Sequence, residues 1–487
     1  MPMVLGIVTV LSISVGTLTY YSASNARTAS ESKDDTRSFS LSESAFASAM
    51  AVLNNPSNNA LDPDVLPSSE ATASSSTFEG GTAKWWGTLD RSTAVWTISA
   101  VGLYTNPTGS GTAQIRRKLT AKVPVTPSNT QPNNNPAWNY IYARATGSAC
   151  DVDLANNLSG SSQFYAAGNL CLSNNVGITS ASLIVRGNLD LSNNAFVGAS
   201  TSMSTRVETY VGGQCRYGGG SWASPCSGNQ DARRIFSKKD PPSYVVGVNS
   251  TAPVIPEPAA DYALWYENAI PGPSQNCTTV TGTPPTFDNN YPNRDNSVSS
   301  VVDLTPSSSY TCRVGPAGSP SGELSWNNST KVLTVAGTIF IDGSAKISNG
   351  SLNQYNGQAT IYLSGTLLIG NGAKLCGGIS GGNCDFAAWN PNTEMLTFVA
   401  NGSGGQAETG NGILMDNNGQ YQGGLYATNA VDFRNNSQSD GPIIGSTVKF
   451  NNNVQNDQFP TITVVPVGMP GSPIVYAQPN QPQLFAG

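Results

Sequence analysis

The sequence predicts a mainly β protein with one long N-terminal α-helix, then a small antiparallel sheet, then a right-handed parallel β-helix. Three observations support this fold class. The first 26 of the 487 residues carry no charge, and Arg27 is the first charged side chain. Short apolar stretches separated by Gly, Asn and Ser recur through the rest of the chain, which is typical of turn-rich β structure. One pattern, G-x-L-x-L/I followed by small polar residues, returns near every 20 residues, as in stacked β-helical repeats.

Residues 1–54 are expected to form one long helix with two different halves. Residues 1–26 are apolar, and residues 27–54 are amphipathic because apolar side chains recur at helical spacing at Phe39, Phe46, Met50 and Leu53. An uncharged helix on a long polar chain is either a membrane tether or an element that polymerises by packing against copies of itself. The side chains expected to pack in such an assembly are Met3, Val4, Leu5, Ile7, Val8, Val10, Leu11, Ile13, Val15, Leu18, Tyr20 and Tyr21.

Residues 55–125 are expected to form a small head that packs on the helix. The stretches 95–104 and 113–125 flank a turn, and in the second of them apolar and polar side chains alternate. This alternation predicts a half-buried antiparallel hairpin. Residues 126–137, which are rich in Asn and Pro, are expected to be a linker.

Residues 138–487 are expected to form the β-helix domain. Clear copies of the repeat begin at Gly168, Gly187, Gly337 and Gly365, and weaker ones at Gly424 and Gly445. Each repeat is too thin to bury its inward face alone, so stacked neighbours are expected to make the core. The pattern breaks at about 205–330, where prolines and four of the eight cysteines indicate a disulfide-rich insertion, with Tyr262-Ala-Leu-Trp265-Tyr266 packed on the flank of the β-helix.

The cysteines predict an oxidising compartment. Their number is even, they are well spread, and no C-x-x-C pair occurs, a pattern that favours four disulfides in an exported protein. Pairing between sequence neighbours is the simplest arrangement, although the sequence alone cannot fix the connectivity. The expected pairs are Cys150–Cys171, Cys215–Cys226, Cys277–Cys312 and Cys376–Cys384.

The composition argues against several classes of function. The sequence has no histidine, which removes Ser–His and Cys–His nucleophile pairs and His-containing metal sites. Its 24 basic and 30 acidic residues form no basic cluster, so no nucleic-acid partner is expected. Asp151 and Asp153 are the carboxylates to consider for a polysaccharide-active enzyme, but no acidic ladder accompanies them. We therefore expect no catalytic residues, no metal site and no cofactor.

The run MPMVLGIVTVLSISVGTLTYYSASNAR, with the amphipathic continuation to Leu53, resembles the N-terminal helix of type IV pilins, in particular accessory or PilX-like pilins. A helix laid against a small antiparallel sheet is also the design of the pilin head. The resemblance implies a helix that is held in the membrane before assembly and in the filament core afterwards. The sequence departs from the family at Leu5, where a glutamate is usual, and this weakens assignment to a major subunit more than assignment to the class.

These observations predict a structural subunit of an extracellular type IV pilus-like filament that displays a β-helical domain on its outside. The expected partners are copies of the same chain, the inner membrane and pilus assembly machinery before assembly, and surface glycans. The alternative is a membrane-tethered or secreted monomeric β-helix adhesin. A third class is a polysaccharide-active enzyme.

Overall fold

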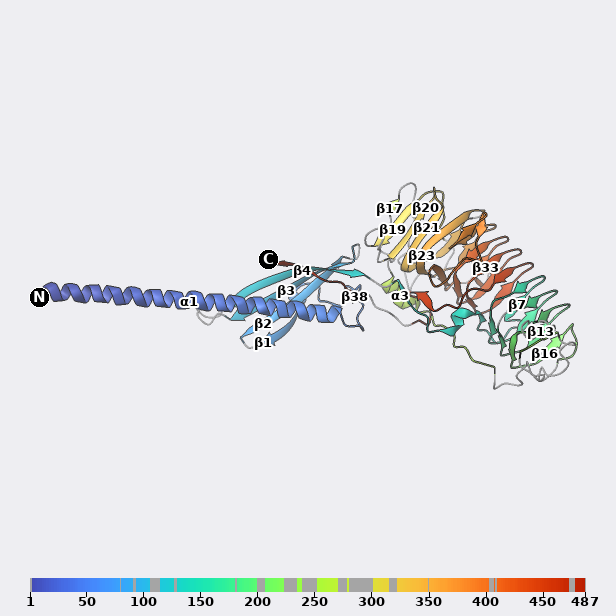
Figure 1. Ribbon diagram of the computed structural model, residues 1–487, viewed down its shortest axis with the longest axis horizontal. Coiled ribbons are helices and arrows are strands. Elements are labelled where there is room, and N and C mark those ends of the chain that lie inside the picture. Colours follow the sequence, from blue (N-terminus) through green and yellow to red (C-terminus); the bar gives the residue numbers. More distant parts are fainter. Residues whose placement is uncertain are drawn as a thin grey trace. The chain divides into compact units, whose positions relative to one another are not determined.

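A computed structural model shows a mainly β protein with one long N-terminal helix, as the sequence predicts (Figure 1). The residues it describes are 2–78, 80–90, 93–105, 114–126, 129–179, 182–198, 206–222, 234–238, 252–269, 278–279, 301–314, 322–348, 350–402, 407, 410–472 and 478–486. The chain divides into two compact units. Unit 1 comprises residues 1–127 and 476–487, and unit 2 comprises residues 128–475.

Helix α1 (Pro2–Leu53) lies on the sheet of unit 1 with its second half. The side chains it buries there are mostly small: Asp34, Ser38, Ser42, Ala45, Ala49 and Leu53. A Cβ atom added at Gly102 would lie 1.9 Å from the carbonyl oxygen of Ser38, so the two backbones approach very closely. The apolar stripe predicted through Phe39 is therefore wrong at that residue, which is 42% exposed, because this close approach leaves space for small side chains only.

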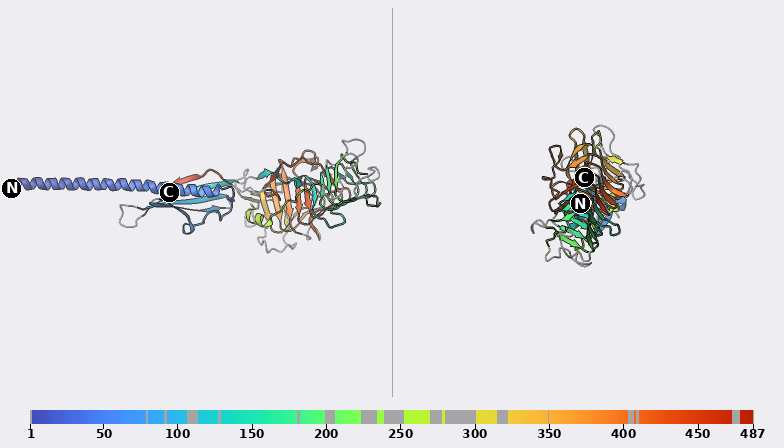
Figure 2. Two further views of the ribbon diagram at one scale, coloured as in Figure 1. Left: turned by 90° about the horizontal axis from the view of Figure 1, so that it is seen from below. Right: turned by 90° about the vertical axis from the view of Figure 1, so that its right-hand side faces the viewer.

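The sheet of unit 1 is antiparallel and contains the predicted hairpin. After the short 3₁₀ helix η1 (Glu70–Thr72), its strands are β1 (Ser74–Phe78), β2 (Gly81–Asp90), β3 (Val95–Thr105), β4 (Gln114–Thr126), β38 (Gln478–Pro479) and β39 (Gln483–Ala486). Strands β38 and β39 both pair with β4, which brings the C-terminal end of the chain onto unit 1 (Figure 2). Sequence analysis ended the second domain at residue 487, whereas the structure ends unit 2 at residue 475, because the last strands satisfy the open edge of β4.

Unit 2 contains a ten-stranded parallel sheet within the described residues. Its strands, in spatial order, are β18 (Val301–Asp303), β22 (Ser344–Ile347), β24 (Leu367–Ile369), β29 (Asn411–Met415), β32 (Ala430–Phe433), β35 (Val448–Phe450), β7 (Val152–Leu154), β10 (Leu170–Leu172), β13 (Leu189–Leu191) and β16 (Cys215–Tyr217). The spatial order therefore starts in the middle of the sequence, runs toward its end, and then continues from its beginning.

A second, larger sheet of unit 2 is parallel except at β17, β19 and β20, which pair in antiparallel direction. Its strands are β17 (Thr278–Thr279), β19 (Tyr310–Val314), β20 (Gly322–Asn327), β21 (Val332–Ile341), β23 (Leu352–Leu363), β25 (Lys374–Cys376), β28 (Met395–Ala400), β30 (Gln420–Gln422), β31 (Gly424–Ala427), β33 (Gln438–Asp440), β34 (Ile443–Gly445), β36 (Gln455–Asp457), β6 (Ile141–Ala143), β8 (Ser159–Gly160), β9 (Phe164–Ala166), β11 (Gly177–Ile178), β12 (Ser182–Val185), β14 (Phe196–Val197) and β15 (Glu208–Val211). Two small antiparallel pairs complete unit 2: β5 (Thr130–Pro132) with β37 (Val464–Pro466), and β26 (Ile379–Ser380) with β27 (Asn383–Cys384).

One layer of unit 2 is built from both ends of its sequence. Strand β34 pairs with β6, β35 with β7, and β36 with β8, each in parallel register. Each layer consists of three successive strands. In this layer the first two strands are β35 and β36, and the third is β6, which comes from the beginning of the unit 2 sequence. We call these three strands the composite layer. The pairing of β5 with β37 also joins the segment that leads into unit 2 to the segment that leads out of it.

The turns after six strands of the ten-stranded sheet repeat the same asparagine conformation. Six asparagines have φ between 56° and 59°, a left-handed conformation that Asn tolerates better than most residues: Asn157, Asn175, Asn194, Asn418, Asn436 and Asn453. Their side chains also join neighbouring layers, as in the bond from Asn175 Nδ2 to Asn157 Oδ1 at 3.1 Å. The Asn-rich turns of the sequence therefore set the corner of these six layers.

The parallel strands alternate inward and outward side chains. Leu170 and Leu172 are buried in the interior of the stack, whereas Cys171 between them faces outward. Leu170 lies in register with Leu189, as the repeat predicts. The predicted equivalence of the copies at Gly337 and Gly365 is wrong: Gly337 pairs with Ala359, and Leu367 pairs with Ala345, so the two copies occupy different positions in neighbouring layers.

Candidate functional site

The first half of α1 presents an apolar surface. Every large apolar side chain described there is between 55% and 78% exposed: Val8, Val10, Leu11, Ile13, Val15, Leu18, Tyr20 and Tyr21. At about 100° per residue, these side chains point over roughly two thirds of the circumference of the helix. The predicted positions Met3, Val4, Leu5 and Ile7 lie in the helix, but their side chains are outside the described part. Within that part, no helix reaches the combination of length and hydropathy that crossing a membrane requires.

The remaining strip of this half consists of small residues. Thr9, Ser12, Gly16 and Thr19 follow one another at helical spacing, and a Cβ atom at Gly16 would meet no atom within 4 Å. The hydroxyls of Ser12 and Thr19 donate to carbonyl oxygens of the same helix, at 2.7 Å to Val8 and 2.8 Å to Val15. These polar groups are therefore satisfied within the helix, and the strip can approach another backbone closely without leaving a hydrogen bond unmade.

The second half of α1 is fixed to the sheet by charge as well as by packing. The guanidinium of Arg117, on β4, donates to both carboxylate oxygens of Asp35, with Nη2 at 2.6 Å from Oδ2. This hydrogen-bonded pair lowers the pKa of Asp35 below its usual value. The pair is solvent-exposed, so it orients the helix more than it stabilises the unit.

The structure confirms two of the four predicted disulfides. Cys150 pairs with Cys171 at a Cα–Cα distance of 5.5 Å, and Cys376 pairs with Cys384 at 5.2 Å. Cys215 and Cys312 are also disulfide-bonded. Their predicted partners, Cys226 and Cys277, lie outside the described residues. The confirmed pairs close local loops on the outer surface of unit 2.

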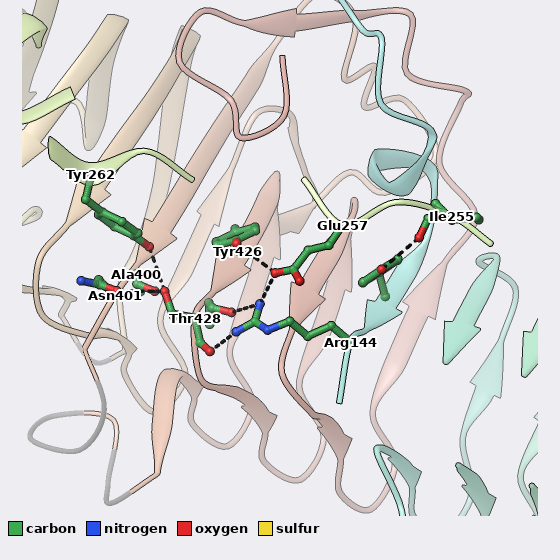
Figure 3. Close-up of polar contacts among 10 residues, drawn as sticks. Arg144, Ile255, Glu257, Tyr262, Ala400, Asn401, Tyr426 and Thr428 are labelled. Atoms are coloured by element: carbon green, nitrogen blue, oxygen red, sulfur yellow. Dashed lines mark hydrogen bonds and ion pairs between the residues drawn. The ribbon is translucent and has the colours of Figure 1, made fainter. Parts of the chain in front are cut away.

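Residues 252–269, which we call the strap, lie on an outer face of unit 2 (Figure 3). Arg144 anchors it: Nη1 donates to Glu257 at 2.8 Å and to the carbonyl of Ala427 at 3.3 Å, and Nη2 donates to the carbonyl of Thr428. Burial raises the pKa of the Tyr426 phenol to about 12, and the neighbouring Glu257 carboxylate adds to the increase. Tyr426 therefore remains a neutral donor to Glu257, at 3.3 Å.

The aromatic end of the strap packs as predicted. Helix α3 (Tyr262–Asn268) is capped by Asp261, whose carboxylate accepts from the amide of Leu264 at 2.9 Å. The rings of Tyr262 and Tyr362 meet edge to face at 5.3 Å, and those of Tyr266 and Phe340 at 5.2 Å. The strap thus covers an outward-facing row of aromatic side chains, and its contacts are structural.

The carboxylates considered for catalysis are not brought together. Asp151 is fully buried and accepts from the hydroxyl of Ser148 and, at 2.7 Å, from the amide of Asn169, which fixes a turn. Asp153 faces outward beside Lys449, and burial is the main cause of its raised pKa. Among the described residues, no group of three or more His, Cys, Asp or Glu side chains is placed to hold a metal ion.

Sequence analysis missed one buried carboxyl pair, formed by Asp440 on β33 and Asp457 on β36. The two residues lie in register on neighbouring parallel strands. A sequence signal was present: the tripeptides Gln420-Tyr-Gln422, Gln438-Ser-Asp440 and Gln455-Asn-Asp457 repeat the same pattern in three successive layers. It is recognisable only once the layers are aligned.

Comparisons with known proteins give one structural likeness. The sequence matches no protein-family model and no curated protein. The crystal structure of the competence-associated pilin ComZ from Thermus thermophilus is similar over 86% of each chain, at 11% identity and a TM-score of 0.27. At that TM-score the likeness shows neither the fold nor the function of this chain.

Proposed function

We propose that this protein is a structural subunit of an extracellular type IV pilus-like filament. In this proposal the first half of α1 packs against the same helices of other copies in a central core. Unit 2 is displayed on the outside, and its parallel layers form a right-handed β-helix.

The exposed apolar half of α1 is the observation that carries the proposal. A helix that is apolar around most of its circumference has to be surrounded, since a single partner surface would leave part of it in water. Burying one Val, Leu or Ile side chain contributes about 1.5–3 kcal/mol, so the six such positions, together with Tyr20 and Tyr21, supply a large driving force that is insensitive to salt. Copies of the same helix provide matching apolar surfaces together with the small strip at Gly16, where two backbones can meet.

Several features of the other parts support the outer placement of unit 2. In-register parallel pairing of short strands in three successive positions per repeat, as in β10, β11 and β12, is the arrangement expected of β-helical coils. Two confirmed disulfides fit an oxidising, extracellular location. Unit 2 is inserted in the sequence between β4 and the C-terminal strands of unit 1, so the chain enters and leaves it through the sheet of unit 1 and not through α1.

The test is assembly of single-residue variants in the producing cell. Sheared surface fractions of the unaltered protein and of Leu11→Glu and Leu11→Met would be imaged by cryo-electron microscopy. We expect filaments with α1 in the core from the unaltered protein and from Leu11→Met, and none from Leu11→Glu, because a carboxylate cannot be buried unpaired in that core. Secretion and thermal unfolding of unit 2 serve as controls for folding.

Filaments of normal abundance from Leu11→Glu would contradict the proposal. If the unaltered protein yields dispersed particles that bind glycan or matrix, the monomeric, membrane-tethered or secreted adhesin replaces it. A polysaccharide-active enzyme would instead require hydrolysis or elimination that is lost in Asp153→Asn.

A further inference from the structure

A buried row of oxygen-bearing side chains crosses three layers on the outer face of unit 2. Gln422, Asp440 and Asp457 occupy equivalent positions on β30, β33 and β36 and lie in register. Tyr421 precedes Gln422 on β30, and Ser439 precedes Asp440 on β33. Both of these preceding residues are buried on the inward side. Residues 377–394, which we call the cover segment, pack over this row, because the ring of Trp389 lies 3.2 Å from the position of a Cβ atom at Gly441.

The end of the row at Gln422 is fully satisfied. Its Oε1 accepts from the amide of Gly378 at 3.0 Å, and its Nε2 donates to the carbonyl of Asp385 at 2.8 Å. Both partners belong to the cover segment. At the other end, Asp457 is half-buried, and its Oδ2 accepts from Nε2 of Gln438 at 3.0 Å. The row is thus closed at Gln422 and reaches solvent at Asp457.

Asp440, in the middle of the row, is the exception. Its residue is 1% exposed, yet neither carboxylate oxygen accepts a hydrogen bond of normal geometry from any described residue. The Asp457 carboxylate disfavours a negative charge on Asp440, whereas the Gly441 amide favours one. A buried carboxylate without donors or a counter-charge costs several kcal/mol, so such a group normally binds an ion or a proton.

From this geometry we infer that Asp440 and Asp457 hold a hard divalent cation, calcium by its ligand preference. Calcium takes oxygen ligands, accepts one or two oxygens from each carboxylate, and tolerates irregular surroundings. The two Asp440 oxygens that accept no hydrogen bond and the remaining oxygen of Asp457 are ligands of this type, and water entering from the Asp457 side would complete the coordination. A bound cation would link two neighbouring layers beneath the cover segment, independently of any role of α1.

The competing explanation is a proton shared between the two carboxyl groups. Two variants separate these explanations. Asp440→Asn is isosteric with a protonated carboxyl group, so it preserves a proton-sharing site but removes a ligand from a cation site. Asp457→Asn changes the more exposed member and is the second variant if Asp440→Asn folds poorly. Asp416→Asn, at a turn after β29, controls for loss of one negative charge elsewhere in unit 2.

The first measurement is thermal unfolding of the full chain, stripped of metal by a chelator and then titrated with CaCl2. We expect the unfolding temperature of unit 2 to rise with calcium in the unaltered protein and in Asp416→Asn, and to stay constant in Asp440→Asn and Asp457→Asn. The apparent Kd should be on the order of 10⁻⁴–10⁻³ M, as for sites with few protein ligands. No calcium-dependent shift in the unaltered protein, or an equal shift in Asp440→Asn, overturns the inference.

Terbium luminescence provides a readout that stability does not determine. Tb³⁺ bound at this site would be sensitised by Trp389, and calcium would displace it. We expect the signal to disappear in Asp440→Asn, and to fall in Trp389→Phe while the calcium-dependent shift in unfolding temperature remains. A terbium signal that survives in Asp440→Asn would place the ion elsewhere and overturn the assignment.

Discussion

Ile443 on β34 lies in register with Ile141 on β6, although the two residues come from opposite ends of the sequence of unit 2. The next step of the ladder, from Ile141 to Phe164 on β9, is an ordinary pairing of neighbouring layers. The same continuity holds at the corner, where the amide of Asn453 donates to the carbonyl of Asn156 at 2.9 Å. The composite layer therefore bonds to its neighbours as the other layers do, and unit 2 closes by bringing its two ends together.

Folding of the first layers should consequently depend on residues near the end of unit 2. Phe450, on β35, is fully buried, meets Phe433 edge to face at 4.7 Å, and lies in register with Leu154. We expect Phe450→Ala to destabilise unit 2 by about 3–5 kcal/mol because it leaves a cavity in the composite layer. Hydrogen exchange measured by mass spectrometry should show faster exchange in residues 141–191.

The matched control is Phe398→Ala, an equally buried phenylalanine on β28. It should cost a similar free energy of unfolding but leave exchange in residues 141–191 closer to that of the unaltered protein. Equal acceleration there by both variants would show that unit 2 opens as one cooperative body, and would contradict a special role for the composite layer.

The corner asparagines are expected to stabilise the stack through both their conformation and their side chains. Asn436 has φ of 58°, and its Oδ1 accepts from Asn453 Nδ2 at 3.0 Å. Asn436→Gly loses the amide bond, at about 0.5–1.5 kcal/mol, but keeps the backbone unstrained. Asn436→Ala should be less stable than Asn436→Gly, since a left-handed conformation costs an ordinary residue roughly 1–2 kcal/mol.

Chemical denaturation of the two variants checks this order. The neighbouring Asn435 is the control position, because its φ is not in the left-handed region. There the glycine variant should be no more stable than the alanine variant. The same order at both positions would mean that conformation does not explain the asparagines.

The close approach of α1 to β3 should make Gly102 intolerant of any side chain. A Cβ atom there would lie 1.9 Å from the Ser38 carbonyl oxygen and 2.7 Å from the Ser42 amide nitrogen, both in the helix backbone. We expect Gly102→Ala to destabilise unit 1 by at least about 1–3 kcal/mol, because the helix has to shift away from the sheet. Calorimetry should show a lower transition for unit 1 and an unchanged one for unit 2.

Gly16→Ala is the control for Gly102→Ala, since a Cβ atom there meets nothing within 4 Å. It should leave the unit 1 transition unchanged or raise it slightly through helix propensity. A stable Gly102→Ala variant would show that the helix backbone does not touch the sheet as closely as described.

The ion pair between Asp35 and Arg117 predicts a small acid dependence of the docking of α1. Because Arg117 lowers the folded-state pKa of Asp35, the pair contributes stability above the unfolded-state pKa of about 3.9 and loses it as the pH falls through the folded value. In Arg117→Gln, the unfolding temperature of unit 1 should fall less steeply below pH 4 than in the unaltered protein. Calorimetry would contradict this coupling if the unfolding temperature of unit 1 fell equally with pH below pH 4 in Arg117→Gln and in the unaltered protein.

Much of the local structure could be predicted from the sequence. The uncharged run to Ala26 and the helical spacing of apolar residues up to Leu53 predict a single helix of the length observed. Alternation in residues 113–125 predicts the hairpin, and pairing between sequence neighbours predicts the disulfides Cys150–Cys171 and Cys376–Cys384. Each of these features depends on residues that are near one another in the chain, where propensity and spacing act directly.

The tertiary structure decided which distant segments meet. Repeats of nearly equal length can stack in many orders, so no local pattern shows that β35 lies beside β7 or that β39 completes the sheet at β4. Phe39 is exposed for the same reason: the approach of Gly102, on another strand, selects small residues for the buried face of α1. Asp440 resembles any other strand aspartate in the sequence, and only stacking under the cover segment removes it from water. The sequence by itself determined the helix, the strands, the corners and the local disulfides, whereas the stacking order, the closure of both units and the buried carboxyl pair arise from long-range contacts that no local pattern encodes.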